Sequence, residues 1–534
     1  MNILSFHIGH DGSVTILQGD EIVIHHQLDR FNGLKHQFYP TIELFDKIKN
    51  LKIKFDKVIV TSMSEGNRFP INYFLRKYLN IDQSKIITVN QNEHHLFHAI
   101  CARHFFNYPK NAVYFIADGD GGDKPIHNKN NQFLNGVTGS ECESIYDEKL
   151  NSIFKYYVTN RQINLITDKF SITRNLSLGK AYQKLVYELG LNAHEEGKAM
   201  ALSSYGKFSN DIANKLVFDS NWNLNWMSNI EENWEPLNYF NRYMLNPSVN
   251  HTAKDSKSLD FVKTFQIVFQ LLALQKIKKI NNKYDTLVLS GGCAQNVLNN
   301  TFLKEELKKN ILADPFNGDF GISLGSALHY TNVKVKPLKH ICSGFNPALS
   351  LDRFQSKDVT PQEVAEILVK EPIAIFSGKS EQGQRGLGFR SLLGNPLDEK
   401  ILHKINSIKK REWYRPFACT VLEENASELF EIATNQTSPY MMFVYKSKDK
   451  RLKNVCSVDN YSRIQTLNRD FHSKYYDLIS AFYRLTKLPA VLNTSLNLPG
   501  RVLCENTNDL YFMMKNSSLK YCYLSDENKL LCLT

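Results

Sequence analysis

Short apolar runs separated by turn residues follow one another through the first quarter of the chain. Runs of this length, rich in Ile, Val and Phe, predict buried β-strands. The predicted strands are Asn2–Phe6, Val14–Leu17, Glu21–His26, Lys57–Thr61, Ile86–Val89 and Ala112–Ala117. Helical segments lie between the later strands, so the pattern indicates an α/β fold.

Helical periodicity is clearest in Leu259–Ile280. Its apolar positions at helical spacing are Phe261, Phe265, Val268, Phe269 and Leu272. This amphipathic helix leads into a predicted strand at Thr286–Leu289. In the last third of the chain, Ile373–Phe376 predicts a strand, Tyr475–Leu485 a helix and Val491–Asn497 another strand that ends in short polar residues.

The 534 residues are too many for one ordinary hydrophobic core, so we expect more than one domain. We place one domain at residues 1–340, a linker at 341–360 and a second domain at 361–534. Polar stretches at about 123–175 and 207–258 are predicted insertions, the former irregular but with a β-hairpin near Ser144–Tyr157. The tryptophans Trp222, Trp226 and Trp234 favour a packed hairpin over a base-stacking platform.

The net charge of +11 at pH 7 raises the question of a nucleic-acid ligand. The basic excess is spread along the chain, so it suits small anionic substrates at least as well as DNA. The nine cysteines are scattered and form no C-x-x-C pair, which favours reduced thiols and argues against a thiolate zinc site. The sequence has no secretory segment and no apolar run of about 18 residues, so we expect a cytoplasmic protein without a membrane segment.

Candidate metal ligands stand in Glu93–Ala99, where His94 and His98 are four residues apart. On a helix such residues share a face, so both rings can bind one ion. Asp118 follows a predicted strand, and Asp319 follows a later turn. Two carboxylates would complete a site that suits Fe(II) or Mn(II). For the histidines taken alone, a chance pair or a pair satisfied in the core is the alternative.

Candidate phosphate loops occur at Gly9–Ser13 and at Asp118–Gly122. Backbone N–H groups of such turns cradle phosphate in nucleotide-binding proteins, although an ordinary hairpin has the same composition. His10 and Asp11 stand where a general base and its orienting carboxylate could lie. The turn Gly291-Gly292, between a strand and a helix, would also bring backbone close to a nucleotide.

The second domain opens with a loop rich in glycine and cations, Gly378–Ser391. Arginines in such a loop are suited to a bidentate grip on phosphate. Further cations and short polar side chains follow downstream. The candidates in this domain are Lys379, Arg385, Arg390, Arg415, Arg463, Asn493, Ser495 and Asn497. Their number predicts a phosphate or nucleotide pocket.

Taken in order, these motifs resemble those of the O-carbamoyltransferases of the nodulation-protein-U and antibiotic-tailoring type. In the first domain they are His10-Asp11-x-Ser13, Asp29-Arg30-Phe31 with Lys35-His36, His94-His95-x-x-His98-Ala99, Asp118-Gly119-x-Gly121, Glu196-Gly197-Lys198-x-Met200, Gly291-Gly292-x-Ala294-x-Asn296 and Gly318-Asp319-x-Gly321. In the second they are Glu381-x-Gly383-x-Arg385-x-Leu387-Gly388-x-Arg390-Ser391, Arg415-Pro416-Phe417-Ala418 and Asn493-Thr494-Ser495-x-Asn497.

The resemblance implies an N-terminal actin-like domain, a duplicated ribonuclease-H-like fold of the threonylcarbamoyl-modification type. It implies a C-terminal α/β domain that forms carbamoyl adenylate from carbamoyl phosphate and ATP with Mg²⁺. The first domain would bind that intermediate beside an iron-like metal and transfer the carbamoyl group to a substrate hydroxyl. The enzyme class is then an ATP-dependent O-carbamoyltransferase.

The resemblance also assigns roles to individual residues. His94, His98, Asp118 and Asp319 would bind the metal. His10, with Asp11, would take the hydroxyl proton, and Lys35 would stabilise charge at the same centre. The adenylate would contact Gly121, Gly197, Lys198, Gly291, Gly292 and Asn296. Lys379, Arg385, Arg390, Arg415 and Arg463 would hold phosphates, with Asn493, Ser495 and Asn497 at the nucleotide.

The sequence departs from the family pattern in the second domain. Gly378-Lys379 stands where Gly-Arg is usual, and Gln384-Arg385-Gly386 where Pro-Arg-Ala is usual. The pattern His-Val-Asp-Gly-Thr-x-Arg becomes Ser457–Arg463, which removes a histidine and a threonine hydroxyl. A catalytically impaired nucleotide-binding or assembly protein of the same fold is therefore the alternative, and a hydrolase or kinase-like ATPase is a third. The acceptor is expected to be a small molecule, with hydroxymethylated DNA as a second option.

Overall fold

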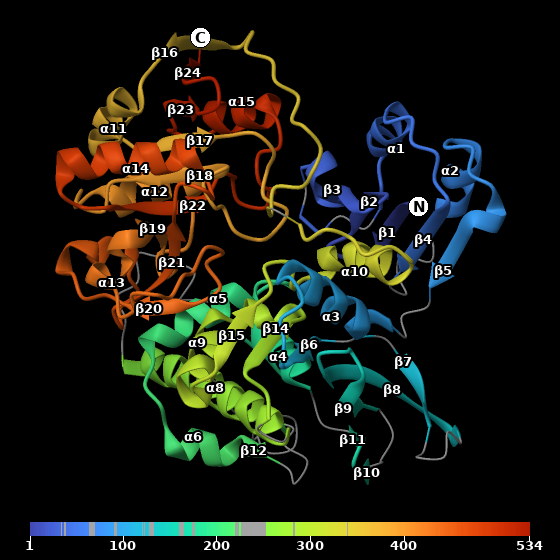
Figure 1. Ribbon diagram of the computed structural model, residues 1–534. Coiled ribbons are helices and arrows are strands. Elements are labelled where there is room, and N and C mark those ends of the chain that lie inside the picture. The colour runs from blue at the N-terminus through green and yellow to red at the C-terminus, as the bar shows by residue number, and fades with distance from the viewer. Residues whose placement is uncertain are drawn as a thin grey trace. The chain divides into compact units, whose positions relative to one another are not determined.

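The computed structural model describes residues 1–533 except 34, 37–38, 63–69, 90–92, 120, 122, 128–132, 160–164, 174–176, 219–223, 226–252, 281–282 and 339. The chain divides into two compact units (Figure 1). Unit 1 comprises Met1–Glu21 and Lys52–Pro337, and unit 2 comprises Ile22–Leu51 and Leu338–Thr534. Both contain β-sheets with packed helices, so the predicted α/β class is confirmed. Trp222, Trp226 and Trp234 lie outside the described residues.

The first sheet has five strands in the order β3-β2-β1-β4-β5. They are β1 (Asn2–Ile8), β2 (Ser13–Gln18), β3 (Glu21–Gln27), β4 (Lys57–Ser62) and β5 (Ile86–Val89). Six of the seven residues of β1 are buried, which is why its sequence is a nearly continuous apolar run rather than an alternating one. All five strands were predicted.

The second sheet has eight strands, with the path β10-β11-β9-β8-β6-β14-β15 and β7 paired to β8. They are β6 (Ala112–Ala117), β7 (Asp123–His127), β8 (Phe133–Tyr146), β9 (Ser152–Val158), β10 (Leu165–Ile166), β11 (Phe170–Thr173), β14 (Thr286–Ser290) and β15 (Asn310–Ala313). The hairpin expected near Ser144–Tyr157 is present as β8 and β9. The expectation of an irregular stretch was wrong, because this region supplies strands to the sheet.

The two sheets repeat one arrangement of five strands. In the first, β1 is antiparallel to β2 and parallel to β4, which is parallel to β5. In the second, β6 is antiparallel to β8 and parallel to β14, which is parallel to β15. β9 lies beside β8 as β3 lies beside β2. Strand order and direction are therefore duplicated within this part of the chain.

A pair of helices, α3 (His94–Phe105) and α10 (Ile322–His329), packs together in unit 1. α3 contacts β6 and β14 of the second sheet, while α10 contacts β1 and β2 of the first. The helices approach closely because Gly325 has no side chain: a Cβ there would lie 2.0 Å from the carbonyl oxygen of Phe97. Two candidate site residues, His94 and His98, lie on α3, and a third, Asp319, lies just before α10.

The other helices of unit 1 are α2 (Ile71–Lys77), α4 (Leu178–Glu188), α5 (Glu196–Leu202), α6 (Asn210–Lys215), α8 (Ala253–Lys278) and α9 (Val297–Leu307), and a short hairpin joins β12 (Val217–Phe218) to β13 (Leu224–Asn225). The predicted amphipathic helix is confirmed as α8. Its five predicted apolar positions are all buried. α8 packs against α4, α5 and α9.

Unit 2 is built on a nine-stranded sheet in the order β16-β24-β23-β17-β18-β22-β19-β21-β20. The strands are β16 (Phe354–Asp358), β17 (Ile373–Phe376), β18 (Arg390–Gly394), β19 (Ala418–Leu422), β20 (Val444–Lys446), β21 (Tyr461–Leu467), β22 (Ala490–Ser495), β23 (Tyr521–Leu524) and β24 (Lys529–Leu533). β16, from the stretch expected to be a linker, pairs with β24.

The helices of unit 2 are α1 (Ile42–Asn50), α11 (Pro361–Lys370), α12 (Ile401–Lys409), α13 (Ala426–Leu429), α14 (Ser473–Thr486) and α15 (Thr507–Lys515). α11 begins with Thr360, whose side chain accepts from the backbone of Glu363 while the Glu363 side chain bonds back to the Thr360 N–H, and Pro361 follows the cap. α11 and α14 bury Leu368, Leu478 and Phe482 in the core of this unit. In the described part of the chain, no helix has the length and apolar character to cross a membrane.

Candidate functional site

Four side chains of unit 1 converge on one point. Nε2 of His94 lies 3.7 Å from Oδ2 of Asp118 and 3.4 Å from Oδ1 of Asp319. Nε2 of His98 lies 3.4 Å and 3.6 Å from the same two carboxylate oxygens. One ligand atom of each residue lies within 4.8 Å of the others. The structure thus brings together all four residues that the sequence singled out as metal ligands.

Local structure explains the convergence. His94 and His98 are one turn apart on α3, with ring centroids 4.9 Å apart. Asp118 directly follows β6, and Asp319 begins a short 3₁₀ helix, η7 (Asp319–Gly321), that leads into α10. The start of α4 packs on the Asp118 backbone, since a Cβ on Gly179 would lie 2.5 Å from the Asp118 carbonyl oxygen.

The donor set fits a metal ion. Nε2 of both histidines and Oδ2 of both aspartates are buried and make no hydrogen bond in the structure. Two ligands about 2.1 Å from one ion at a tetrahedral angle are about 3.4 Å apart, which is close to the observed spacings. Nitrogen and carboxylate ligands without thiolate suit a divalent ion of borderline or hard character.

The electrostatics point the same way. Burial lowers the pKa of His94, but the charges of Asp319 and Asp118 outweigh it and raise the pKa to about 10. Burial raises the pKa of Asp319, but His10 and His94 hold it well below its usual value. The negative potential that favours protonated imidazole here also favours a divalent cation, which would replace those protons.

Two more histidines face Asp319. Nε2 of His10 lies 3.5 Å from Oδ2 of Asp319, and its Nδ1 lies 3.9 Å from Oδ2 of Asp11. His10 thus sits beside the predicted metal ligands with the predicted carboxylate behind it. Nε2 of His7 lies 3.7 Å from the same Asp319 oxygen, and its Nδ1 contacts Thr61 Oγ1 at 3.0 Å. Sequence analysis missed His7, whose one signal is a histidine near the end of an apolar strand.

Charged residues of the loops predicted to bind adenylate lie near the half-buried thiol of Cys293. The carboxylates of Asp118 and Glu196 both act on Cys293 in the turn after β14, and burial raises the pKa of that thiol well above its usual value. Gly291 has φ +82°, and a Cβ there would lie 2.4 Å from the Ala117 carbonyl oxygen. A Cβ on Gly292 would lie 3.1 Å from Oδ1 of Asp118. The glycine turn therefore packs against the end of β6, next to the candidate ligand Asp118.

The remaining adenylate candidates differ in their surroundings. Gly197 borders open space, and Lys198 pairs with Glu195 at 2.6 Å. Gly121 is packed against a carbonyl, because a Cβ there would lie 2.7 Å from the oxygen of Glu141. The side chain of Asn296 caps α9 by accepting from Asn299 N–H and exchanges hydrogen bonds with Gln266. The geometry of Asn296 is that of a helix cap.

Unit 2 contains a group of mutually repelling cations, of which Lys409 is buried and the other four are partly buried. We call this group the cationic cluster: Arg385, Lys409, Arg411, Arg415 and Arg463. Burial lowers the pKa of Arg463 well below its usual value, and the charges of Arg385 and Arg415 lower it further. Burial, Arg411 and Arg415 lower the pKa of Arg385 to about 10. Nη1 of Arg415 contacts Oε2 of Glu412 at 3.1 Å.

Such a cluster calls for an anion, because buried like charges repel and lose their hydration. Three of its members were predicted, whereas Lys409 and Arg411 were not among the candidates. Lys35, predicted to stabilise charge beside His10, belongs to unit 2. Its charge helps to lower the pKa of Lys409, so it lies near the cluster.

Two predicted phosphate ligands lie differently. Nε and both Nη atoms of Arg390 donate to the carbonyls of Ser377, Gly378, Phe389, Cys504 and Glu505. Those bonds use all five donors of the guanidinium, so the geometry favours a structural role over a phosphate contact. The charge of Lys379 lowers the pKa of His26 and of Cys342, neither of which belongs to the cationic cluster.

Two of the predicted polar residues of β22 and the turn after it, Ser495 and Asn497, contact Lys409. Its Nζ donates to the carbonyl oxygens of Ser495 and Asn497 and to Oδ1 of Asn497, each at 2.6 Å. Ser495 Oγ donates to the same Asn497 oxygen. Nδ2 of Asn493 donates to Thr420 Oγ1 at 2.8 Å, whereas its buried Oδ1 has no hydrogen-bond partner in the structure. Ser495 and Asn497 therefore border the cluster at Lys409, whereas Asn493 contacts Thr420.

Comparison with known families agrees with this arrangement. A model of the carbamoyltransferase N-terminus matches residues 49–328, more than half of the chain, and a model of the carbamoyltransferase C-terminus matches residues 364–529. The chain belongs to the carbamoyltransferase family. The first match contains the four converging ligands, and the second contains the cationic cluster.

Individual relatives span different shares of this carbamoyltransferase. An uncharacterized protein of Methanocaldococcus jannaschii is 27% identical over 95% of both chains. Nodulation protein NolO of Bradyrhizobium diazoefficiens is 34% identical over 42% of this chain and 45% of its own. Nodulation protein U of Sinorhizobium fredii is 32% identical over 40% of each. The predicted relationship to nodulation protein U is confirmed.

Among solved structures, the activator of the 2-hydroxyisocaproyl-CoA dehydratase from Clostridium difficile aligns with 62% of this chain and 94% of its own. The TM-score is 0.31 and the identity 13%. A likeness this weak supports no argument about the fold, so the description of the N-terminal region rests on its own strand order.

Proposed function

We propose that this protein is an ATP-dependent O-carbamoyltransferase that works in two half-reactions. Unit 2 takes carbamoyl phosphate and ATP with Mg²⁺ and forms carbamoyl adenylate. Unit 1 binds this adenylate and passes the carbamoyl group to an acceptor hydroxyl. The observation that carries the proposal is that the match to the carbamoyltransferase C-terminus contains the cationic cluster, in which Lys409 is fixed by the Ser495 and Asn497 carbonyls and the arginines repel one another unless an anion binds.

The first half-reaction forms carbamate and then joins it to AMP. Water releases phosphate from carbamoyl phosphate, leaving carbamate. A carbamate oxygen then attacks the α-phosphorus of ATP, and pyrophosphate leaves. Both substrates and both leaving groups are polyanions, so several arginines can stabilise the charge that shifts between them.

In the second half-reaction the acceptor oxygen forms a bond to the carbamoyl carbon, the bond to the adenylate oxygen breaks, and AMP leaves. His10 is the proposed base for the hydroxyl proton. Asp319 and Asp11 lie beside its ring and raise its pKa to about 10, so a divalent cation on Asp319 would have to offset that charge before the ring can accept the proton. His94, His98, Asp118 and Asp319 would hold one Fe(II)-like ion, which supplies positive charge for the adenylate phosphate. The duplicated strand order supports a duplicated ribonuclease-H-like, actin-like domain around them.

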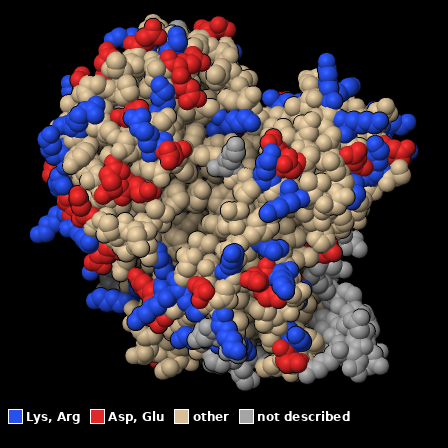
Figure 2. Space-filling view, viewed as in Figure 1, with Lys and Arg blue, Asp and Glu red and all other residues tan. Residues whose placement is uncertain are grey.

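The acceptor class is proposed as a small molecule that carries a hydroxyl group, such as a sugar or natural product. On the face shown in Figure 2, Lys and Arg side chains are interspersed with Asp and Glu. A duplex-binding surface is typically a continuous basic stripe, and binding to it falls steeply with salt. Hydroxymethylated DNA is the second option.

The test uses the full chain with carbamoyl phosphate, ATP and Mg²⁺ and no acceptor. We expect release of pyrophosphate and a product with the mass of carbamoyl adenylate. Arg385→Ala should stop both, and omission of carbamoyl phosphate should leave only background release. If ATP binds but wild-type protein forms no pyrophosphate, the adenylation assignment is wrong and a non-catalytic nucleotide-binding protein becomes the better description.

A further inference from the structure

Residues 22–51 belong to unit 2, although unit 1 precedes and follows them in the sequence. Within this stretch, β3 ends at Gln27 and a 3₁₀ helix, η1 (Leu28–Phe31), follows. The backbone N–H of His25 donates to the Ser343 carbonyl at 2.9 Å, and the N–H of Phe345 donates to His26 Nδ1 at 3.3 Å. The stretch is therefore built into the C-terminal part of the chain.

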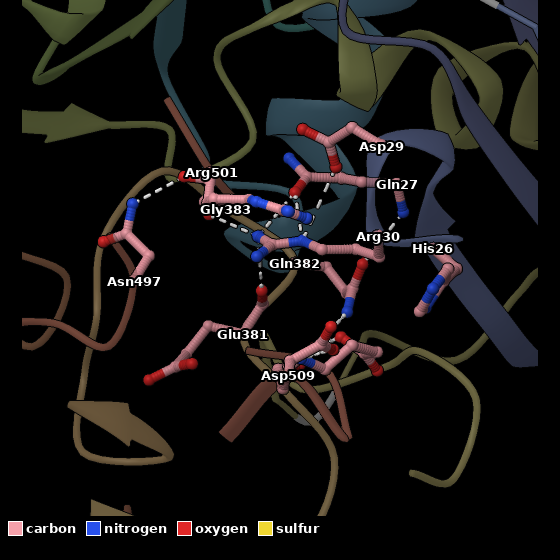
Figure 3. A network of polar contacts seen from close by, with 12 residues as sticks. His26, Gln27, Asp29, Arg30, Glu381, Gln382, Gly383, Asn497, Arg501 and Asp509 are labelled. Atoms are coloured by element: carbon pink, nitrogen blue, oxygen red, sulfur yellow. Dashed lines mark hydrogen bonds and ion pairs between the residues drawn. The ribbon is translucent and has the colours of Figure 1, made fainter. Parts of the chain in front are cut away.

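Arg30, in η1, holds one turn of unit 2 (Figure 3). Its side chain is buried, with 6% of its surface exposed. Nη2 of Arg30 donates to the carbonyl oxygens of Glu381 and Gly383, each at 3.3 Å, and to Gln27 Oε1 at 2.6 Å. Its Nε also donates to Gln27 Oε1, at 3.0 Å. One guanidinium thus spans two carbonyls of the same turn.

The turn is held from its other side by a pair of glutamines. The backbone N–H of Gln27 donates to Gln382 Oε1 at 2.9 Å, and Gln382 Nε2 donates to Ser380 Oγ at 2.9 Å. The N–H of Gln382 donates to the Ile341 carbonyl at 3.0 Å. Because Gln382 is fully buried, no solvent rearrangement competes with these contacts.

This turn is the start of the loop that carries Arg385. Oε1 of Glu381 accepts from the backbone N–H groups of Leu387, Phe389 and Arg390 at 2.6, 3.0 and 3.2 Å. The Glu381 carboxylate therefore folds the far end of the loop back onto its beginning. Arg385 lies between these two anchors, so its place in the cationic cluster depends on where the turn sits.

A guanidinium suits this task better than an ammonium. Its Nη2 contacts the turn while its Nε donates to Gln27, so the planar group is held in place as it binds the carbonyls, whereas lysine offers a single nitrogen on a flexible stem. Arg30 makes these contacts without belonging to the cationic cluster, since its hydrogen bonds go to backbone and amide oxygens.

We propose that Arg30 is a positioning residue for the anion site of unit 2: it fixes the Glu381–Gly383 turn and thereby the phosphate-facing placement of Arg385. The inference rests on the proposed function insofar as that site is the one that forms carbamoyl adenylate. Its direct readout, however, is anion binding, which does not require turnover.

The test compares Arg30→Lys with Arg501→Lys in the full-length protein. Arg501 also belongs to unit 2, but its guanidinium lies 4.6 Å from the Phe512 ring centroid and, among the described residues, donates no hydrogen bond to the turn. We expect Arg30→Lys to weaken binding of inorganic pyrophosphate, measured by calorimetry, by roughly tenfold or more. Arg501→Lys should bind as wild type does. Where adenylation is active, KM for ATP should rise more than kcat falls.

Hydrogen exchange separates positioning from general destabilisation. In Arg30→Lys, the amides of Leu387, Phe389 and Arg390 should exchange faster, while those of β22 and α14 keep their wild-type rates. Wild-type pyrophosphate affinity in Arg30→Lys, or uniformly faster exchange across unit 2, would overturn the proposal. If wild-type protein binds pyrophosphate but forms no carbamoyl adenylate, the proposed function fails while this comparison still decides the role of Arg30. No pyrophosphate binding by wild type would refute both.

Discussion

Replacing one arginine of the cationic cluster should make the ligand-free protein more stable and its liganded form weaker. Arg463→Met is the sharpest case, because methionine keeps the apolar stem of the side chain and removes only the charge. Nε of Arg463 is buried and makes no hydrogen bond in the structure, and Arg385 and Arg415 repel it. The substitution therefore removes a cation that folding alone does not satisfy.

The magnitude follows from the unpaired donor and the repulsion. A buried donor left without a partner costs about 1–3 kcal/mol, and like charges add to that cost. In a unit of this size 1 kcal/mol shifts Tm by about 2–4 °C, so a rise of roughly 2–12 °C is expected. A charge-assisted hydrogen bond to phosphate is worth about 1.5–3 kcal/mol, so pyrophosphate should bind about 10- to 100-fold more weakly.

The assay is thermal unfolding of the full chain with and without pyrophosphate, together with calorimetric titration. Arg469→Met is the matched control, since Arg469 is exposed and paired with Asp477, and a surface pair of this kind is worth about 0–1 kcal/mol. The two effects of Arg463→Met must have opposite signs. A lower Tm without ligand, combined with unchanged stabilisation by pyrophosphate, would refute the reasoning.

Three further outcomes are expected. Asp319→Asn should lower the metal content of purified protein measured by mass spectrometry, because a neutral amide is a weaker ligand. Asp314→Asn, a buried acid outside the ligand set, should not; equal loss in both would count against the site. His10→Ala should keep pyrophosphate release but slow transfer by about 10²–10⁴-fold, and wild-type transfer would remove His10 as the base. Burial lowers the pKa of His472 to about 4, and its Nδ1 caps α14 by accepting from Tyr475 N–H, so stability should fall by about 3 kcal/mol as pH drops from about 6.5 toward 4. In urea unfolding, His472→Asn should flatten this slope while exposed His403→Asn keeps it; a steep slope in both would contradict the assignment.

Much of the fold could be predicted because its signals are local. The strands β1 to β6 are short apolar runs, and the buried stripe of α8 has a clear helical period. The convergence of the four candidate ligands could be predicted because two of them are four residues apart and the others follow a strand or a turn. Apolar runs and residue spacing can be read without knowing the tertiary contacts, so the strands and the helix were predicted correctly.

Long-range packing set the limit of the sequence analysis. The sequence does not show whether an arginine donates to a ligand or to backbone carbonyls. The carbonyl contacts of Arg390 therefore could not be predicted, and Arg390 was grouped with Arg385. Arg30 was grouped with the first domain by position, but its partners lie some 350 residues further along the chain. The stretch before the predicted hairpin looked irregular because it contains polar residues that the fold buries, such as Glu143 of β8, which pairs with Lys276.

The altered segment Ser457–Arg463 changes side chains while it keeps a tight turn. Asn460 adopts φ +65° at the position where the family pattern has glycine, a conformation that asparagine tolerates better than most residues. The turn is closed by hydrogen bonds from Asn460 N–H to Ser457 O at 2.9 Å and from Ser457 N–H to Tyr461 O at 2.8 Å. Ser457 Oγ donates to Asp459, so the hydroxyl that replaces the usual imidazole is engaged within the turn. Since Arg463 still lies in the cationic cluster, the substitutions remove a titratable group from this segment but leave its contribution to anion binding in place. Adenylation that depends less on pH than in relatives with the histidine is therefore a better expectation than loss of the half-reaction.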